Sequence, residues 1–139
     1  MRLRVGKVTN IDTESGKVRV NYEDEDNATL KLYMMTFNGE YSMPKVGDMV
    51  VTLHMENGSS KGFCLGTYYG GTLKPKTGFG YRKDFPGGSY VESAHDEYLI
   101  SAQSITLDAN EIVLGDVTLE DIILRIERLE DALNLPHTL

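Results

Sequence analysis

Apolar side chains occupy every second position in five short stretches of the first half of the chain, which is the period of a β-strand. The stretches are residues 3–11, 18–22, 30–34, 49–55 and 62–69. Turn residues separate them, and the connection at 13–16 predicts a hairpin between the first two. Five short strands with no intervening helix predict a small closed or partly closed barrel, such as an OB-fold, over residues 1–70.

A seven-residue repeat covers residues 98–114, YLISAQSITLDANEIVL. Within each unit the apolar side chains alternate with polar ones, so each unit predicts one short strand and a corner. We expect Thr106, Asp108 and Asn110 to point outward. The predicted inward row consists of Tyr98, Ile100, Ala102, Ile105, Leu107, Ala109, Ile112 and Leu114.

One unit of this repeat makes a single edge of a β-solenoid, whose cross-section needs two or three edges. Because no other part of the chain carries the repeat, we predict that two further copies of the chain supply the missing edges. The result would be a trimeric, intertwined β-helix, or prism, over residues 89–115, with its first strand at 89–91 and a turn at 93–96. The alternative is an antiparallel meander within one chain, with turns near 103–104 and 110–111.

The barrel and the repeat are separated by a stretch rich in turn residues. Residues 70–90 hold six glycines and two prolines, more than the interior of a strand or helix accommodates. We therefore predict an ordered connector over residues 71–88 and a domain boundary within it.

The end of the chain, 116–139, carries the only helical pattern. Thr118 followed by Asp121 resembles a capping box, and Pro136 is expected to end the helix. Arg125 and Glu130 have the spacing of ion pairs between parallel neighbouring helices. Apolar residues at spacings of 3, 4, 3 and 4 predict the seam of a short coiled coil: Leu119, Ile122, Ile126, Leu129 and Leu133. The alternative is an amphipathic helix that packs on its own barrel.

Composition narrows the classes of partner. With 14 basic and 21 acidic residues the net charge is −7, which repels phosphate backbones, so we expect no nucleic acid among the partners. No window approaches the length of a membrane span, and the first residues lack the apolar core of a signal peptide. The single cysteine, Cys64, lies in an apolar run and is expected to be a small core residue.

The sequence contains no constellation typical of catalysis. His54, His95 and His137 are scattered, and no HxH, HExxH or CxxC motif occurs. Asp24 and Asp26 lie in an acidic tip that lacks the glycine and the glutamate of an EF-hand loop. We therefore expect no enzyme activity, no cofactor and no metal site.

Three phrases of the sequence, in this order, are similar to those of a known family. They are PKVGDMV at residues 44–50, GFCLG at 62–66 and DFPGGSYVE at 84–92. Their order and spacing resemble the phage baseplate assembly protein V family, the central spikes of contractile tails and related injection machines. The resemblance covers nearly all of the chain up to residue 115, and residues 105–115 look like the trimeric β-helix of that family.

The resemblance implies a homotrimer that carries its OB domains around the tail axis and uses the β-helix as a stiff shaft. It also implies synthesis in a host cytoplasm, a place in a tail baseplate or similar injection particle, and hub or tail-tube proteins as partners. The chain departs from the family at its end, because the metal-binding HxH tip is absent and a coiled coil follows instead. A separate tip protein could then occupy that end.

Two other functions compete with a structural role. The first is an OB-fold module that binds an oligosaccharide or oligonucleotide, with its stacking face made of aromatic residues. The second is a glycan hydrolase with a carboxylate pair, for which the sequence offers only its abundance of acidic residues. The aromatic residues of the first hypothesis are Tyr33, Phe37, Tyr41, Tyr68 and Tyr69.

Overall fold

The computed structural model describes residues 1–23, 31–55, 61–71, 73–78 and 80–136. It divides into two compact units, Met1–Gly78 and Phe79–Leu139. This division falls inside the stretch predicted to be a connector. The described structure is mostly β, with one helix near the C-terminus, as the alternation pattern predicted.

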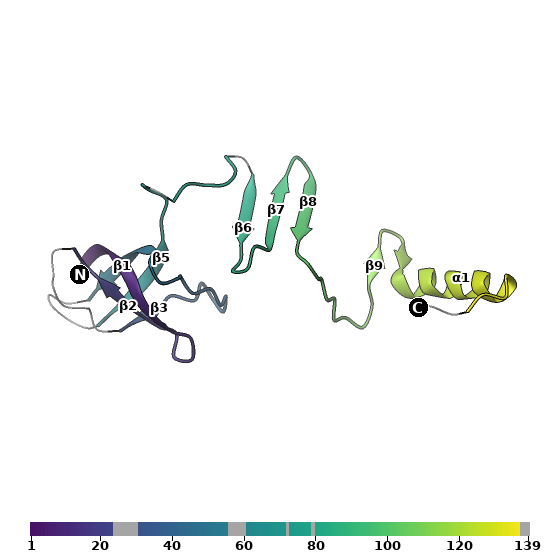
Figure 1. Ribbon diagram of the computed structural model, residues 1–139, viewed down its shortest axis with the longest axis horizontal. Coiled ribbons are helices and arrows are strands. Elements are labelled where there is room, and N and C mark those ends of the chain that lie inside the picture. The colour runs from purple at the N-terminus through teal and green to yellow at the C-terminus, as the bar shows by residue number, and fades with distance from the viewer. Residues whose placement is uncertain (24–30, 56–60, 72, 79, 137–139) are drawn as a thin grey trace. The chain divides into compact units, whose positions relative to one another are not determined.

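The first unit is a closed barrel of five strands (Figure 1). Its strands follow one another around the barrel in the order β1-β2-β3-β5-β4, and β4 pairs with β1 to close it. The pair β3–β5 is parallel and the other pairs are antiparallel. The strands are β1 (Arg2–Asp12), β2 (Lys17–Asn21), β3 (Leu32–Met34), β4 (Met49–His54) and β5 (Gly62–Thr67). Each lies at a predicted stretch, and the barrel is compatible with an OB-fold.

The side chains that fill the barrel are mostly valines, together with a leucine, a tyrosine and a cysteine. The apolar core consists of Val8, Val18, Val20, Tyr22, Leu32, Val50 and Cys64, none more than 1% exposed. The hydroxyl oxygen of Tyr22 lies 2.6 Å from both Thr52 Oγ1 and His54 Nε2. The barrel therefore buries its polar groups as one hydrogen-bonded cluster, which avoids the cost of leaving them unsatisfied.

The phrase at residues 44–50 is a turn fixed against β1. The side chain of Asp48 accepts a 2.8 Å hydrogen bond from the backbone N–H of Lys45, and Gly47 has a φ of +97°. The backbone N–H of Val8 donates to the carbonyl of Asp48, and Gly47 donates to the carbonyl of Val8. Gly47 and Asp48 thus fix the conformation of the turn that leads into β4.

The second unit begins with an antiparallel sheet in the order β6-β7-β8: β6 (Tyr81–Asp84), β7 (Tyr90–Ala94) and β8 (Glu97–Ser101). A two-residue loop joins β7 to β8, and both of its residues, His95 and Asp96, have positive φ, as in a type I′ hairpin turn. Arg82 on β6 pairs with Asp84 at 3.1 Å and, across the sheet, with Glu92 at 3.3 Å. We did not predict β6, because the glycines and prolines around it concealed its strand pattern.

Residues 102–112 form no strand among the described residues. The short strands β9 (Val113–Leu114) and β10 (Val117–Thr118) then form a hairpin. Gly115, the first of its two loop residues, has a φ of +63°. This placement of glycine is typical of a type II′ turn.

Helix α1 (Leu119–Ala132) follows directly. Thr118 caps it as predicted, since its hydroxyl oxygen accepts a 3.1 Å hydrogen bond from the N–H of Asp121. The helix ends before Pro136: Asn134 has a φ of +56° and the N–H of Leu135 donates to the carbonyl of Glu130, as in a Schellman motif. Leu133, a predicted seam residue, is therefore the C-cap and not part of the helix.

The second unit does not contain the predicted meander in its expected form. Its strands are joined by turns before β7, at His95–Asp96 and at Gly115–Asp116, whereas the bends at Gln103 and Asn110 join no strands. Tyr98 and Ile100 of the repeat lie on β8, in a sheet made within one chain. Residues 102–112 form no strand, and Leu114 pairs with Val117 in the β9–β10 hairpin. The trimeric prism and the coiled coil remain predictions.

Candidate functional site

The two units differ sharply in the burial of their apolar side chains. The barrel has a dry core, but in residues 80–136 no apolar side chain is buried, and Glu130 is the only buried residue of that range. A sheet or helix becomes stable by covering an apolar face, so a unit without such a core depends on something outside it. This exposed apolar surface is the first candidate interaction surface.

The predicted inward row of the repeat is exposed in the single chain. Tyr98 is 68% exposed, Ile105 54% and Leu107 64%. Ile100, Leu114 and the alanines at 102 and 109 are exposed too, and Ile112 is half-buried. So many exposed leucine, isoleucine and tyrosine side chains indicate an interaction surface, since folded monomers rarely leave large apolar patches in water.

The predicted seam of α1 is also open. Leu119 and Leu129 are exposed, and Ile122 and Ile126 are half-buried. Glu130 is 8% exposed, although the heptad pattern assigns it to the rim, where an ion pair with a neighbouring helix would form. The leucines of the predicted seam are therefore exposed in the single chain, whereas Glu130, predicted at the rim, is buried.

A hydrogen bond and a hollow connect the repeat to the helix. The backbone N–H of Leu119 donates to the carbonyl of Ile112 at 2.8 Å. Residues 109–112 and the first turns of α1 enclose a hollow of about 350 Å³, with Leu119, Ile123 and Leu124 among its lining residues. The end of the repeat and the start of α1 therefore lie against each other around a hollow with both apolar and polar lining residues.

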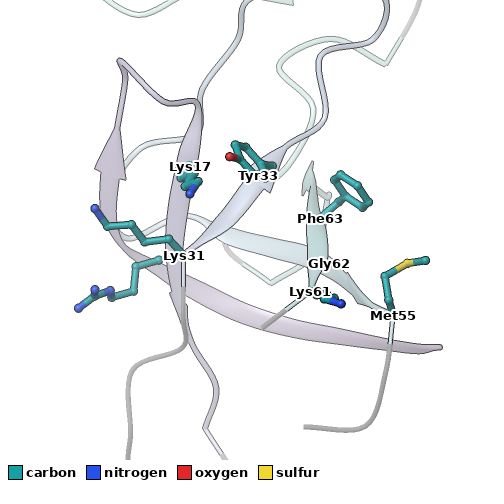
Figure 2. Close-up of a pocket in the computed structure, with 8 residues that line it drawn as sticks. Lys17, Lys31, Tyr33, Met55, Lys61, Gly62 and Phe63 are labelled. Atoms are coloured by element: carbon teal, nitrogen blue, oxygen red, sulfur yellow. The ribbon is translucent and has the colours of Figure 1, made fainter. Parts of the chain in front are cut away.

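A different surface lies on the outside of the barrel, where a groove of about 730 Å³ crosses β2, β3 and β5. Figure 2 shows its labelled side chains, with Tyr33 and Phe63 on neighbouring strands and lysines beside them. We call this the basic–aromatic groove. Its lining residues are Lys17, Arg19, Lys31, Tyr33, Met55, Lys61, Gly62 and Phe63.

Strand pairing arranges these side chains in two rows. Lys17 is the partner of Tyr33 on β3, which is the partner of Phe63 on β5. These three form the first row, and the amine of Lys17 lies 4.5 Å from the centre of the Tyr33 ring. Two residues away along each strand lie Arg19, Lys31 and Lys61, which form the second row. The intervening residues, Val18 and Leu32, point into the core, so both rows face outward.

The other predicted residues are placed as follows. Cys64 is buried in the core as predicted, and burial raises the pKa of its thiol. His54 belongs to the buried polar cluster, and His95 lies in the β7–β8 turn. His137, Asp24 and Asp26 lie outside the described residues.

Of the five aromatic residues proposed as a stacking face, only Tyr33 lines the groove. We missed Phe63 and the four cationic residues. Alternation could have indicated Phe63, because its neighbour Cys64 was predicted to face the core. The cations lie far apart in the sequence, and only the pairing of β2, β3 and β5 brings them together.

In the described ranges, no three histidine, cysteine, aspartate or glutamate side chains gather as a metal site would require. The described part of the chain also has no helix with the length and apolarity needed to cross a membrane. Comparison with models of known protein families gives no match, and comparison with curated proteins gives none either. The resemblance drawn from the sequence phrases therefore remains a prediction.

Proposed function

We propose that the chain forms a homotrimer that serves as the central spike or hub of a contractile tail baseplate or related injection particle. One observation carries the proposal: residues 80–136 bury no apolar side chain in the single chain. Two further copies would cover the exposed rows on the repeat and on α1. Full burial of a leucine or isoleucine side chain contributes roughly 1.5–3 kcal/mol of stabilising free energy. Each such residue in the predicted rows would add a contribution of this size to the trimer.

The proposed trimer would use the repeat as an intertwined β-helix and α1 as a short parallel coiled coil. The OB-fold assignment of the barrel belongs to this proposal, and its support is the closed five-stranded barrel. Three interleaved backbones leave few strand edges open, and each rung is held by both neighbours. Such a shaft is stiff, which is the mechanical property that an injection device requires.

The partners of this trimer would be other hub, baseplate or tail-tube proteins. The chain would be synthesised in the host cytoplasm and would become part of the tail of an assembled particle. The proposed trimer would act as a short spike, a cap or a socket for a separate tip protein. The function is mechanical, so the proposal includes no enzyme activity.

Electron microscopy of particles tests the assignment to a tail. The coding sequence would be disrupted in the genome that carries it and restored from a plasmid as the control. We expect particles without the central density of the baseplate, or no assembled tails, and recovery on complementation. Morphologically normal and active particles without the chain would contradict the proposed function.

A further inference from the structure

The barrel has a local charge very different from that of the whole chain. Residues 1–78 hold ten basic and nine acidic residues, whereas residues 79–139 hold four basic and twelve acidic ones. The acidic excess that argued against nucleic acid thus belongs to the second unit. Because exposed charges are screened beyond roughly 8–10 Å at physiological salt, the groups next to a groove decide what it attracts.

The second row of the basic–aromatic groove consists of three cationic side chains. Arg19 lies on β2, whereas Lys31 and Lys61 directly precede β3 and β5, and all three line the groove. Like charges that line one groove repel one another. The carboxylate of Asp12 lies 3.6 Å from the amine of Lys31 and offsets part of this repulsion. Both side chains are well exposed, so the ion pair is weak. The side chains of Arg19 and Lys31 therefore offer positive charge to an anionic ligand in the groove.

The first row adds two exposed aromatic rings. Tyr33 is 53% exposed and Phe63 45% exposed, and their backbones are paired in register. Adjacent strands are roughly 4.8 Å apart, so both rings belong to the same outward face of the barrel. Flat exposed rings stack on nucleobases whatever the base, because every base has a π-face.

We propose that the basic–aromatic groove binds single-stranded nucleic acid, with phosphates on the cationic row and bases on Tyr33 and Phe63. An acidic polypeptide would use the cations but would have no need of two flat rings. A neutral oligosaccharide would use the rings but gain nothing from the cations. The inference rests on the barrel alone and does not depend on the oligomeric state or on a place in a tail.

Fluorescence anisotropy tests the proposal with the full chain and a labelled oligo-dT of about 15 nucleotides, at the upper end of the sites that single barrels of this kind cover. We expect binding at 50 mM salt that weakens roughly 20- to 50-fold at 200 mM. This range follows from three or four cations, each adding about −0.7 to the slope of log K against log salt.

Matched variants separate the two rows. Tyr33→Ala and Phe63→Ala should each weaken binding at least about fivefold, whereas Tyr33→Phe, which keeps the ring, should stay within about twofold. Tyr41→Ala is the control, since Tyr41 is 70% exposed and outside the groove. Arg19→Gln should weaken binding and make the salt slope shallower by about 0.7.

Three results would overturn the proposal. The first is the absence of binding at 50 mM salt. The second is equal binding by Tyr33→Ala, Phe63→Ala and Tyr41→Ala, which would leave the rings without a role. The third is displacement of the labelled strand by poly-glutamate as effectively as by unlabelled oligo-dT, which would indicate an acidic polypeptide as the ligand.

Discussion

The backbone N–H of Leu119 donates a 2.8 Å hydrogen bond to the carbonyl of Ile112. This bond joins the last unit of the seven-residue repeat to the first residue of α1, across the β9–β10 hairpin. Leu119 follows Ile112 by seven residues, and Ile126 follows Leu119 by seven, so the spacing of the repeat continues into the predicted seam. We infer that the hairpin transmits register from the helix to the repeat.

Removal of residues 116–139 tests this registration role. Strand pairing between chains is slow, because loop-closure or association entropy is lost before contacts form, whereas a helix forms from local contacts. We expect the truncated chain to form trimers more slowly or in lower yield, while those that form remain stable. Refolding of both chains, followed as trimer mass against time, measures the effect.

Two other outcomes of the truncation are informative. Equal rates and equal yields would remove the registration role of the helix. Aggregation of the truncated chain would instead favour the alternative in which α1 covers an apolar face of its own barrel.

Leu107→Asp tests whether the repeat faces a shared axis. In a trimer this change places three carboxylates together in an apolar interior, at a cost of several kcal/mol, roughly 2–7 for each unsatisfied polar group and more for a charge. We expect loss of the trimer, measured by light scattering.

Thr106→Asp is the matched control for Leu107→Asp. Both residues are exposed in the single chain, so a monomer would tolerate both changes equally. The predicted prism places Thr106 outward, and that variant should keep the trimer mass and the melting temperature. Equal behaviour of the two variants would show that Leu107 does not face the axis.

Gly6→Ala tests the packing of the barrel. An added Cβ at Gly6 would lie 2.5 Å from Val20 Cγ1 and 2.8 Å from the carbonyl oxygen of Asn21, closer than real contacts allow. We expect a loss of roughly 1–3 kcal/mol in the free energy of unfolding, measured by denaturant titration. Gly78→Ala is the control, because an added Cβ there meets nothing within 4 Å. Equal stability of the two variants would contradict the packing described for β1.

The thiol of Cys64 should be unreactive in the folded protein. The side chain is buried, and desolvation raises the pKa of the thiol, so the reactive thiolate is scarce at neutral pH and becomes more abundant only as the pH rises. We expect a chromogenic disulfide reagent to label the chain fully in concentrated guanidinium chloride and hardly at all in native buffer. Rapid stoichiometric labelling of the native protein at pH 7 would be evidence against the core placement.

The barrel was predictable from the sequence because apolar and polar side chains largely alternate along its strands, around a core made within one chain. Val18 and Val20, for example, both point inward from β2 as their spacing requires. The N-cap of α1 was predictable for a similar reason, since Thr118 and Asp121 interact within one helical turn. Local periodicity and local hydrogen bonds are what a single sequence expresses most directly.

The remaining features depend on contacts that the sequence does not express locally. Tyr81 and its neighbours form β6 because β7 pairs with them, despite the glycines on either side. The basic–aromatic groove exists only because β3 pairs with both β2 and β5. This pairing places Lys17 and Phe63 on either side of Tyr33. For the repeat, the predicted partners are other molecules, so neither the sequence nor one chain contains them.

The mass of the protein in solution tests the central claim most directly. One chain has a mass of 15.5 kDa, so light scattering at micromolar concentration should give 46.5 kDa for three chains. A mass of 15.5 kDa under the same conditions would contradict the homotrimer, and with it the β-helix shaft and the proposed spike.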